Sequence, residues 1–198
     1  MITSSFRLVL TVVWGMATLF GTEAVAQRQM ENLGRGVVAV NQGSGRVFGW
    51  RMLGTDPDSI AFNLYRSDGG GKAVKLNDKP IKETTNFIDV KADLSQSNSY
   101  FVRPVLNGRE QAPSAAFTLS ANPLARQYLS IPLQTPSGYS PNDASVGDLD
   151  GDGAYEIVLH QAGRGRDNGS AGMTTEPILE AYKLDGTLLW RINLVLRF

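Results

Sequence analysis

The sequence predicts an all-β fold, and three observations support this prediction. Short segments rich in β-branched and aromatic residues follow one another from Val37 onward, and turn-forming clusters such as "NQGSG" and "SDGGGK" separate them. Apolar and polar residues alternate most clearly in "IAFNLYR", which places Ile60, Phe62 and Leu64 on one face of a strand. A helical period of apolar residues is almost absent from the chain.

The first part of the chain has the composition of a small β-sandwich. The segments expected to form strands are, in chain order, Val37–Val40, Val47–Met52, Ile60–Arg66, Ala73–Leu76, Phe87–Val90, Ser99–Leu106 and Ala115–Leu119. Trp50, Tyr65 and Tyr100 are the bulky side chains expected to fill the space between two sheets. We therefore predict a fibronectin type III-like β-sandwich domain over residues 27–120.

A second unit is predicted over residues 121–198. Ser120 to Pro136 loses the alternation and contains three prolines, which is typical of a connector. Further along, "KLDGTLLW" has an Asp-Gly pair between two strand-forming segments and predicts a hairpin, with Trp190 expected in the core.

The N-terminus predicts a secretory signal peptide over residues 1–26. Arg7 supplies a positive charge, Leu8 to Phe20 is apolar, and "AVA" ends at Ala26 with small residues where a signal peptidase cleaves. The alternative is a membrane anchor, but the apolar run is shorter than the roughly 20 residues that a spanning helix needs. We expect a secreted or periplasmic protein without a stable membrane anchor.

Composition limits the function classes. The chain has no cysteine, so an exported protein of this sequence depends on packing or on metal for its stability. Its formal net charge is zero, which argues against nucleic acid as a partner because phosphate binding requires a basic field. A hydrophobic content of 42% permits a packed core.

The segment "SVGDLDGDGAYEIVL" places three aspartates on alternate residues around glycines. Calcium binds six to eight oxygens, and alternate side chains can converge on one ion when a glycine such as Gly153 permits a sharp bend. The expected ligands are Asp148, Asp150, Asp152, the carbonyl of Ala154, and Glu156. We predict a Ca²⁺ site in this loop, and magnesium is disfavoured because it requires strict octahedral geometry.

This loop departs from an EF-hand. The twelfth position would be Leu159 rather than a bidentate glutamate, and "YEIVL" is a strand former rather than the start of a helix. The alternative is a solvated Asp-Gly turn without a cation. Three neighbouring carboxylates repel one another when no cation is bound, which favours the calcium interpretation.

Two long segments resemble a known family. Ser140 to Leu194, which opens "SPNDASVGDLDGDG", closely resembles the beginning of the catalytic domain of family 11 rhamnogalacturonan lyases. Arg28 to Pro57, "RQMENLGRGVVAVNQGSGRVFGWRMLGTDP", resembles the family's N-terminal β-domain. The resemblance implies a fibronectin-like domain followed by an eight-bladed β-propeller with calcium loops. It also implies cleavage of the rhamnose–galacturonate backbone of the pectic polysaccharide rhamnogalacturonan I by calcium-assisted β-elimination.

The chain is too short to contain eight propeller blades, and its last residues, "VLRF", depart from the family pattern. We therefore expect a truncated N-terminal part of a secreted pectin-degrading lyase that contains only the first part of the propeller. The resemblance places the family's catalytic base in blades beyond these residues, so this chain alone is expected to be inactive. The alternative is a non-catalytic, calcium-stabilised carbohydrate-binding or adhesion module.

Candidate substrate-binding residues flank the acidic loop. The segment "HQAGRGRDNG" follows a predicted strand, and its arginines could pair with an acidic sugar. The family resemblance also implies that Asn142, just before the acidic loop, contacts the sugar. The candidates are Asn142, Arg164, Arg166, Asp167 and Asn168. A solvated loop and a turn are the alternatives for the same residues. His160, the only histidine, is expected to be a half-buried structural residue rather than a general base.

Overall fold

The computed structural model describes residues 32–43, 45–165 and 171–194. The predicted signal peptide, residues 1–26, lies outside the described residues. The described residues form strands, turns and irregular segments, and they contain no helix that could cross a membrane. The all-β prediction is therefore confirmed for the part of the chain that the structure describes.

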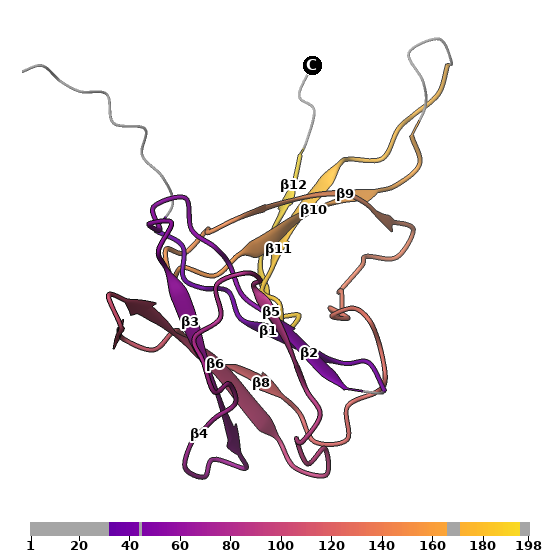
Figure 1. The fold of residues 1–198 in the computed structure, drawn as a ribbon. Helices are drawn as coiled ribbons and strands as arrows, with labels where there is room; N and C mark the ends of the chain where they lie inside the picture. Colours follow the sequence, from indigo (N-terminus) through magenta and orange to yellow (C-terminus); the bar gives the residue numbers. More distant parts are fainter. Residues whose placement is uncertain (1–31, 44, 166–170, 195–198) are drawn as a thin grey trace, which may run out of the picture. The chain divides into compact units, whose positions relative to one another are not determined.

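The strands include all seven segments expected in the first part of the chain, the strand expected after the acidic loop and the predicted hairpin (Figure 1). Arg109–Glu110 and Ser140–Gly147 are strands that the sequence analysis did not predict. In chain order the strands are β1 (Val38–Asn41), β2 (Arg46–Gly49), β3 (Ala61–Asp68), β4 (Val74–Lys75), β5 (Asn86–Asp89), β6 (Asn98–Leu106), β7 (Arg109–Glu110), β8 (Phe117–Leu119), β9 (Ser140–Gly147), β10 (Glu156–Ala162), β11 (Ile178–Tyr182) and β12 (Leu188–Asn193). No strand lies between β8 and β9, which agrees with the expected connector.

The first eight strands form two antiparallel sheets. One sheet has the order β1-β2-β5, and the other has the order β4-β3-β6-β7, with β8 also paired to β6. The longest pairing joins β3 to β6 from Ala61–Val105 to Asp68–Asn98. These pairings bring segments about 40 residues apart in the sequence side by side, which requires packing between the two sheets rather than local turns alone.

Aromatic side chains fill the space between these sheets. Phe48 stacks on Tyr100 with ring centroids 4.9 Å apart, and the Trp50 ring lies 5.4 Å from the Phe62 ring. Trp50 and Tyr100 are buried as predicted, together with Phe62 and Leu64. Burial of each large side chain contributes roughly 1.5–3 kcal/mol of transfer free energy, so this cluster stabilises the packing of the two sheets.

The prediction that Tyr65 fills the core is wrong. Tyr65 follows Leu64 on β3, and because successive side chains point to opposite faces, it lies on the outer face of the sheet. There its ring stacks on the Phe101 ring at 5.2 Å, and its hydroxyl donates a 2.7 Å hydrogen bond to Glu110.

The last four strands form one antiparallel sheet of order β12-β11-β10-β9. The predicted Asp-Gly turn links β11 to β12, with a 2.9 Å hydrogen bond from the amide of Lys183 to the carbonyl of Thr187. Trp190 is half-buried instead of in the core, because β12 is an edge strand with one neighbour only.

A buried carboxylate organises the interior of this sheet. Glu180 on β11 is fully buried, and its Oε2 accepts hydrogen bonds from Gln161 at 2.6 Å and from the Tyr182 hydroxyl at 2.7 Å. Arg191 pairs with its Oε1 at 2.5 Å. Hydrogen bonds from these partners to the ionised carboxylate hold the pKa of Glu180 below its ordinary value, against the opposing effect of desolvation.

A glycine in the β11–β12 turn supports a first prediction. Gly186 has a φ of +89°, and a Cβ at this position would lie 2.3 Å from Cγ of Pro132. Gly186→Ala should therefore lower the free energy of unfolding by about 1–3 kcal/mol, through backbone strain and a clash. Gly138→Ala is the matched control, because Gly138 has a φ of +82° but no atom within 4 Å of the added Cβ. Equal losses of stability in urea titrations of the two variants would contradict the contribution of the clash.

An ion pair near the start of the sandwich supports a second prediction. Arg35 donates hydrogen bonds of 2.5 and 2.7 Å to Asp56, and this pairing holds the pKa of the Asp56 carboxyl below its ordinary value of 3.8. A lowered folded-state pKa contributes stability that is complete above the unfolded-state pKa and is lost as the pH falls through the folded-state pKa.

Asp56→Asn should therefore destabilise the chain at neutral pH and have a progressively smaller effect below about pH 4. Urea titrations of wild type and variant across this range would measure the difference. Asp58→Asn is the control, because Asp58 is exposed. A destabilisation by Asp56→Asn that does not change with pH would contradict the electrostatic explanation.

Candidate functional site

The acidic loop connects β9 to β10 and is folded around its own aspartates. Gly151 and Gly153 have φ values of +78° and +83°, a left-handed conformation that favours glycine. Asp148 accepts hydrogen bonds from the amide of Gly151 at 2.8 Å and from the amide of Gly153 at 3.1 Å. The predicted bend at Gly153 is therefore present, and the first aspartate holds it from inside.

The next two aspartates order the backbone that follows them. Asp150 Oδ1 accepts a 3.2 Å hydrogen bond from the amide of Asp152, and Asp152 Oδ1 accepts a 2.8 Å hydrogen bond from the amide of Ala154. Each of the alternate aspartates thus accepts a hydrogen bond from a backbone amide two or more residues further along the loop. This is the local consequence of the spacing read from the sequence.

Three carboxylates come together in the loop. One oxygen each of Asp148, Asp150 and Glu156 lies within 4.8 Å of the others, and such a group of hard oxygen donors could hold a metal ion. Glu156 is 1% exposed and accepts a 2.8 Å hydrogen bond from the amide of Leu149. Asp152 is outside this group, and the amide of Ala154 bonds to Asp152. The structure therefore brings together three of the four predicted carboxylate ligands.

Lys183 also belongs to this site, and sequence reasoning missed it. Its Nζ lies 2.7 Å from Asp150 and 3.3 Å from Asp152. These hydrogen bonds raise the pKa of Lys183, and the same contact lowers the pKa of Asp150. Lys183 follows β11, and pairing of β11 with β10 carries it to the loop. Only the "KLDG" turn signal marked this residue, and that signal indicated nothing about its partner.

A pocket of about 530 Å³ lies beside the loop. Its walls come from the loop, from the β11–β12 turn, from β8 and from the connector; they include Asp152, Tyr155, Glu156, Lys183, Phe117 and Leu129. Both charged and apolar side chains line this pocket.

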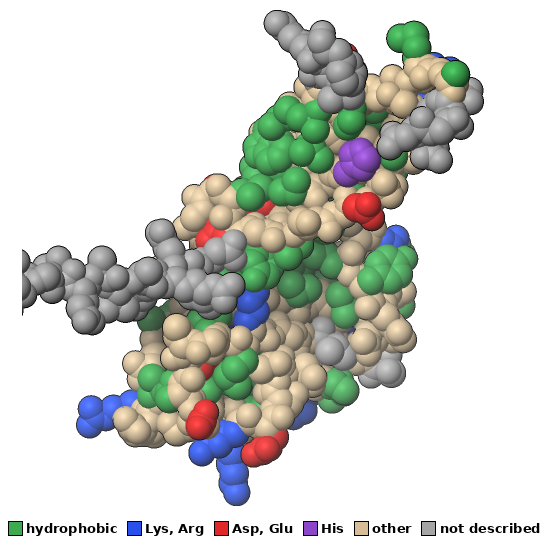
Figure 2. Space-filling view, turned by 90° about the horizontal axis from the view of Figure 1, so that it is seen from above, with side chains coloured by type: hydrophobic (Ala, Val, Ile, Leu, Met, Phe, Trp, Pro, Cys, Tyr) green, Lys and Arg blue, Asp and Glu red, His purple; other side chains and the backbone are tan. Residues whose placement is uncertain are grey.

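The candidate substrate residues lie at another part of the same sheet. Asn142 on β9 is exposed, and its Nδ2 lies 3.4 Å from Nδ1 of His160 on β10. Arg164 follows β10 and is exposed, and its carbonyl accepts a 2.9 Å hydrogen bond from the amide of Thr175. His160 is half-buried, as expected, and Figure 2 shows the chain's only histidine at the surface. The candidates Arg166, Asp167 and Asn168 lie outside the described residues.

The structure does not bring the acidic loop and these residues together. Glu156 begins β10, and Ala162 ends it, with the loop before the strand and Arg164 after it. Six steps of about 3.3 Å separate the two ends, which gives roughly 20 Å. Asn142 lies near the same end of the sheet as Arg164, because Pro141 pairs with Gln161. The four-stranded sheet therefore has an acidic end and an end with polar and basic side chains.

Two family models match consecutive parts of the chain. Residues 28–119 match the model described as the rhamnogalacturonan I lyases beta-sheet domain. Residues 128–197 match the model described as rhamnogalacturonan lyase family 11, C-terminal domain.

Curated and solved proteins show the same similarity. The chain is 47% identical over 180 residues to the rhamnogalacturonan endolyase YesW of Bacillus subtilis strain 168, covering 85% of the chain and 27% of that protein. It is 43% identical over 179 residues to the rhamnogalacturonan exolyase YesX of the same strain, covering 85% of the chain and 28% of that protein. A solved family 11 rhamnogalacturonan lyase of Bacillus licheniformis matches with a TM-score of 0.72 and 50% identity, over 85% of this chain and 29% of that one.

Proposed function

Because the chain belongs to family 11 of the rhamnogalacturonan lyases, we propose that it forms the N-terminal part of an enzyme that cleaves the rhamnose–galacturonate backbone of pectin by β-elimination. The observation that carries the proposal is the match of two family models in one chain, at 47% identity to a curated endolyase. The chain spans slightly more than a quarter of the length of its curated relatives. Both relatives are named for rhamnogalacturonan, so rhamnogalacturonan I is the proposed substrate.

The proposed architecture is a fibronectin type III-like sandwich followed by the first blade of a β-propeller. The sandwich assignment is supported by the antiparallel division into β1-β2-β5 and β4-β3-β6-β7 around one aromatic core. The blade assignment is supported by the four consecutive strands β9 to β12, which pair in sequence order as in a propeller blade. We place the start of the second domain at residue 121.

The acidic loop is proposed to bind Ca²⁺. Asp148, Asp150 and Glu156 would supply carboxylate oxygens, and their mutual distance of 4.8 Å or less suits one hard divalent cation. Bound calcium would supply charge neutralisation within the loop. Asp152 and the carbonyl of Ala154 complete the ligand set proposed from the sequence. The separation of about 20 Å along β10 favours a structural role for this cation over contact with substrate bound near Asn142.

The opposite end of the sheet is proposed to contact the acidic sugar. The guanidinium of Arg164 can pair with a uronate carboxylate, and the amide of Asn142 can bond to a sugar hydroxyl. Arg166, Asp167 and Asn168 are proposed to extend this surface. His160 is 3.4 Å from Asn142, so we propose that it orients this amide rather than abstracting a proton. We assign the catalytic base to none of the described residues.

Export is proposed from the N-terminal sequence. Cleavage after Ala26 would leave Gln27 at the N-terminus of a secreted or periplasmic protein. N-terminal sequencing of the protein from the culture medium or periplasm tests this directly, and exported protein with an intact Met1 would contradict cleavage.

A chimeric enzyme tests the proposed function. Residues 28–197 of this chain would replace the matching segment of the Bacillus subtilis endolyase, and ultraviolet absorbance would follow the release of unsaturated uronide ends from rhamnogalacturonan. We expect an active chimera. Arg164→Ala should lower its kcat/KM by roughly tenfold to a hundredfold, because a charge-assisted hydrogen bond contributes about 1.5–3 kcal/mol.

Arg103→Ala is the matched control, because Arg103 lies on the outer face of the sandwich beside Tyr65. A folded chimera that binds rhamnogalacturonan without releasing product would contradict the lyase proposal and favour the non-catalytic binding module. Equal kcat/KM values for the Arg164→Ala and Arg103→Ala chimeras would contradict the assignment of Arg164 to the substrate surface.

A further inference from the structure

The acidic loop makes a close contact with residues that precede it by more than 100 positions. The carbonyl of Gly153 accepts a 2.7 Å hydrogen bond from the amide of Gly34 and a 3.2 Å hydrogen bond from NH1 of Arg51. Gly34 precedes β1, and Arg51 follows β2. The backbone at the sharpest bend of the loop is therefore held by the N-terminal sandwich.

Glycines permit this approach. A Cβ on Gly153 would lie 2.8 Å from the amide nitrogen of Gly34, and a Cβ on Gly34 would lie 3.2 Å from the carbonyl oxygen of Gly153. A Cβ on Gly36 would lie 2.5 Å from Cζ of Arg51. A side chain at Gly153 or Gly36 would displace the loop or the arginine, because both added Cβ contacts are shorter than 3 Å, and a side chain at Gly34 would be tightly crowded.

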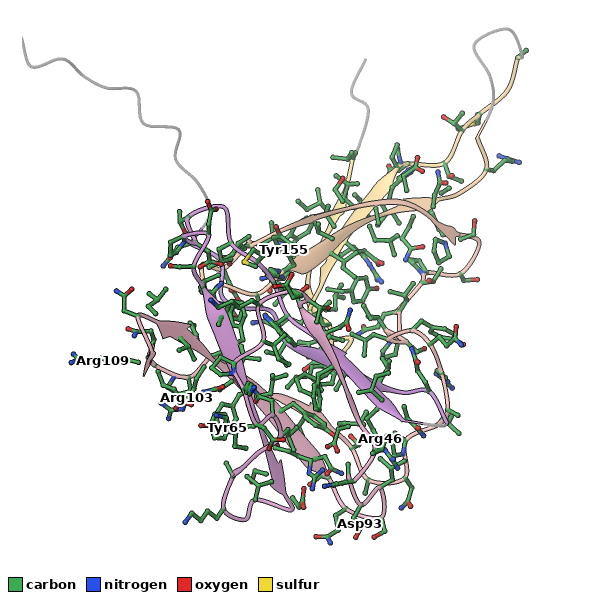
Figure 3. All side chains as sticks on the ribbon, viewed as in Figure 1. Arg46, Tyr65, Asp93, Arg103, Arg109 and Tyr155 are labelled. Carbon is green, nitrogen blue, oxygen red and sulfur yellow. The ribbon has the colours of Figure 1, made fainter. Side chains whose placement is uncertain are left out.

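Arg51 is fixed by several contacts at once. Its guanidinium lies 4.0 Å from the centre of the Tyr155 ring, which Figure 3 labels, and also donates a 3.2 Å hydrogen bond to the carbonyl of Gly34. Its own amide donates a 2.7 Å hydrogen bond to the carbonyl of Arg35. Arg51 thus reaches two residues of the acidic loop, Gly153 through its carbonyl and Tyr155 through its ring.

The contacted residues lie between the carboxylates of the loop. Gly153 and Tyr155 flank Ala154, and Asp152 and Glu156 lie immediately outside them. The conformation that gathers Asp148, Asp150 and Glu156 depends on the bend at Gly153, whose amide bonds to Asp148. Holding the carbonyl side of this bend therefore preorganises the carboxylate group before a cation binds, which lowers the ordering cost of binding.

We propose that Arg51, through Gly153 and Tyr155, is a positioning residue for the cation loop and couples cation binding to docking of the loop on the sandwich. This inference rests on the proposed calcium site. Coupling is reciprocal, so a bound cation strengthens the docking contact by the same factor by which docking strengthens cation binding. The positive charge of Arg51 would by itself repel a cation. Removing Arg51 should therefore weaken cation binding if preorganisation dominates, and strengthen it if electrostatic repulsion dominates.

Calcium titration calorimetry on the full chain tests the proposal, with Asp150→Ala as the variant that removes a ligand. Arg51→Met should weaken calcium binding by about tenfold, within the range typical of coupled sites. Arg51→Lys keeps the charge but loses the planar fork and should rescue only part of the loss. Arg103→Met is the matched control, because Arg103 also lies over a tyrosine ring, at 5.9 Å, but contacts Tyr65 instead of the loop. It should leave the affinity unchanged.

A second measurement separates positioning from general damage to the fold. Calcium should slow proteolysis of the connector, residues 120–136, in wild type and much less in Arg51→Met, at a temperature where both are folded by circular dichroism. Wild-type affinity or tighter binding in Arg51→Met would overturn the coupling, provided that wild type binds calcium and Asp150→Ala does not. Absence of calcium binding in wild type would instead overturn the proposed site itself and the coupling with it.

Discussion

Replacing Asp89 with alanine is expected to lower the free energy of unfolding by about 3 kcal/mol, the lower end of the cost of breaking a buried ion pair, because Arg66 keeps a 2.6 Å contact with Asp68. Asp89 on β5 is 3% exposed, and Arg66 on β3 is 7% exposed. Their side chains meet at 2.5 Å across the two sheets of the sandwich. The other oxygen of Asp89 accepts a 2.9 Å hydrogen bond from the amide of Lys91, and the Tyr100 hydroxyl lies 3.4 Å from the pair.

Urea titration followed by circular dichroism would measure the loss of stability. Asp58→Ala is the control, since Asp58 is exposed, and it should change the free energy of unfolding by less than about 0.5 kcal/mol. The double variant Arg66→Met, Asp89→Leu should recover part of the loss, because an apolar pair removes the buried guanidinium that Asp89→Ala leaves with Asp68 as its ion-pair partner. A single Asp89→Ala variant as stable as Asp58→Ala would refute the role of this ion pair.

Calcium is expected to raise the melting temperature of the chain, and Asp150→Ala is expected to abolish that gain. A ligand present at 100 times its dissociation constant stabilises the folded state by about 2.7 kcal/mol, so the shift is large for a chain of this size. Asp150 is the loop carboxylate that belongs to the three-membered acidic group and also pairs with Lys183 at 2.7 Å. Its removal takes away both a proposed ligand and the nearer of the two aspartates that contact Lys183.

Melting curves in calcium and in chelator, for wild type and variants, would measure the gain. Asp185→Ala is the matched control, because Asp185 lines the pocket beside the loop and bonds to the amide of Thr187 without belonging to the acidic group. It should keep the full calcium-dependent shift. Melting curves of wild type that coincide in calcium and in chelator would refute calcium binding by the folded loop.

The short-range features of this protein could be predicted from its sequence. Strand positions followed from alternation, as in "IAFNLYR", because side chains on a strand repeat every two residues whatever the strand pairs with. The bend at Gly153 followed from the spacing of aspartates and glycines within nine residues, Asp148 to Glu156. These features depend on neighbours in the chain, and residue type determines most of their geometry.

Which side chains of a strand face the core was harder to predict than the position of the strand. Tyr65 was expected in the core because it is bulky, although its place next to Leu64 puts it on the outer face, where it stacks on Phe101. Trp190 was expected in the core for the same reason, and the edge position of β12 leaves it half-buried. Bulk indicates that a residue needs a packing partner, but strand order and face decide which partner it finds.

The sequence by itself determined the all-β class, most of the strand positions and the acidic loop with its glycines. Only the tertiary structure decided that Lys183 contacts Asp150, that Arg51 and Gly34 hold Gly153, and that the acidic loop and Arg164 lie at opposite ends of β10. The physical reason is that periodicity and loop spacing are set by adjacent peptide units. The contact of Lys183 with Asp150, 33 positions away, depends instead on sheet register. The contacts of the loop with residues more than 100 positions away depend on the close approach that Gly34 and Gly153 allow.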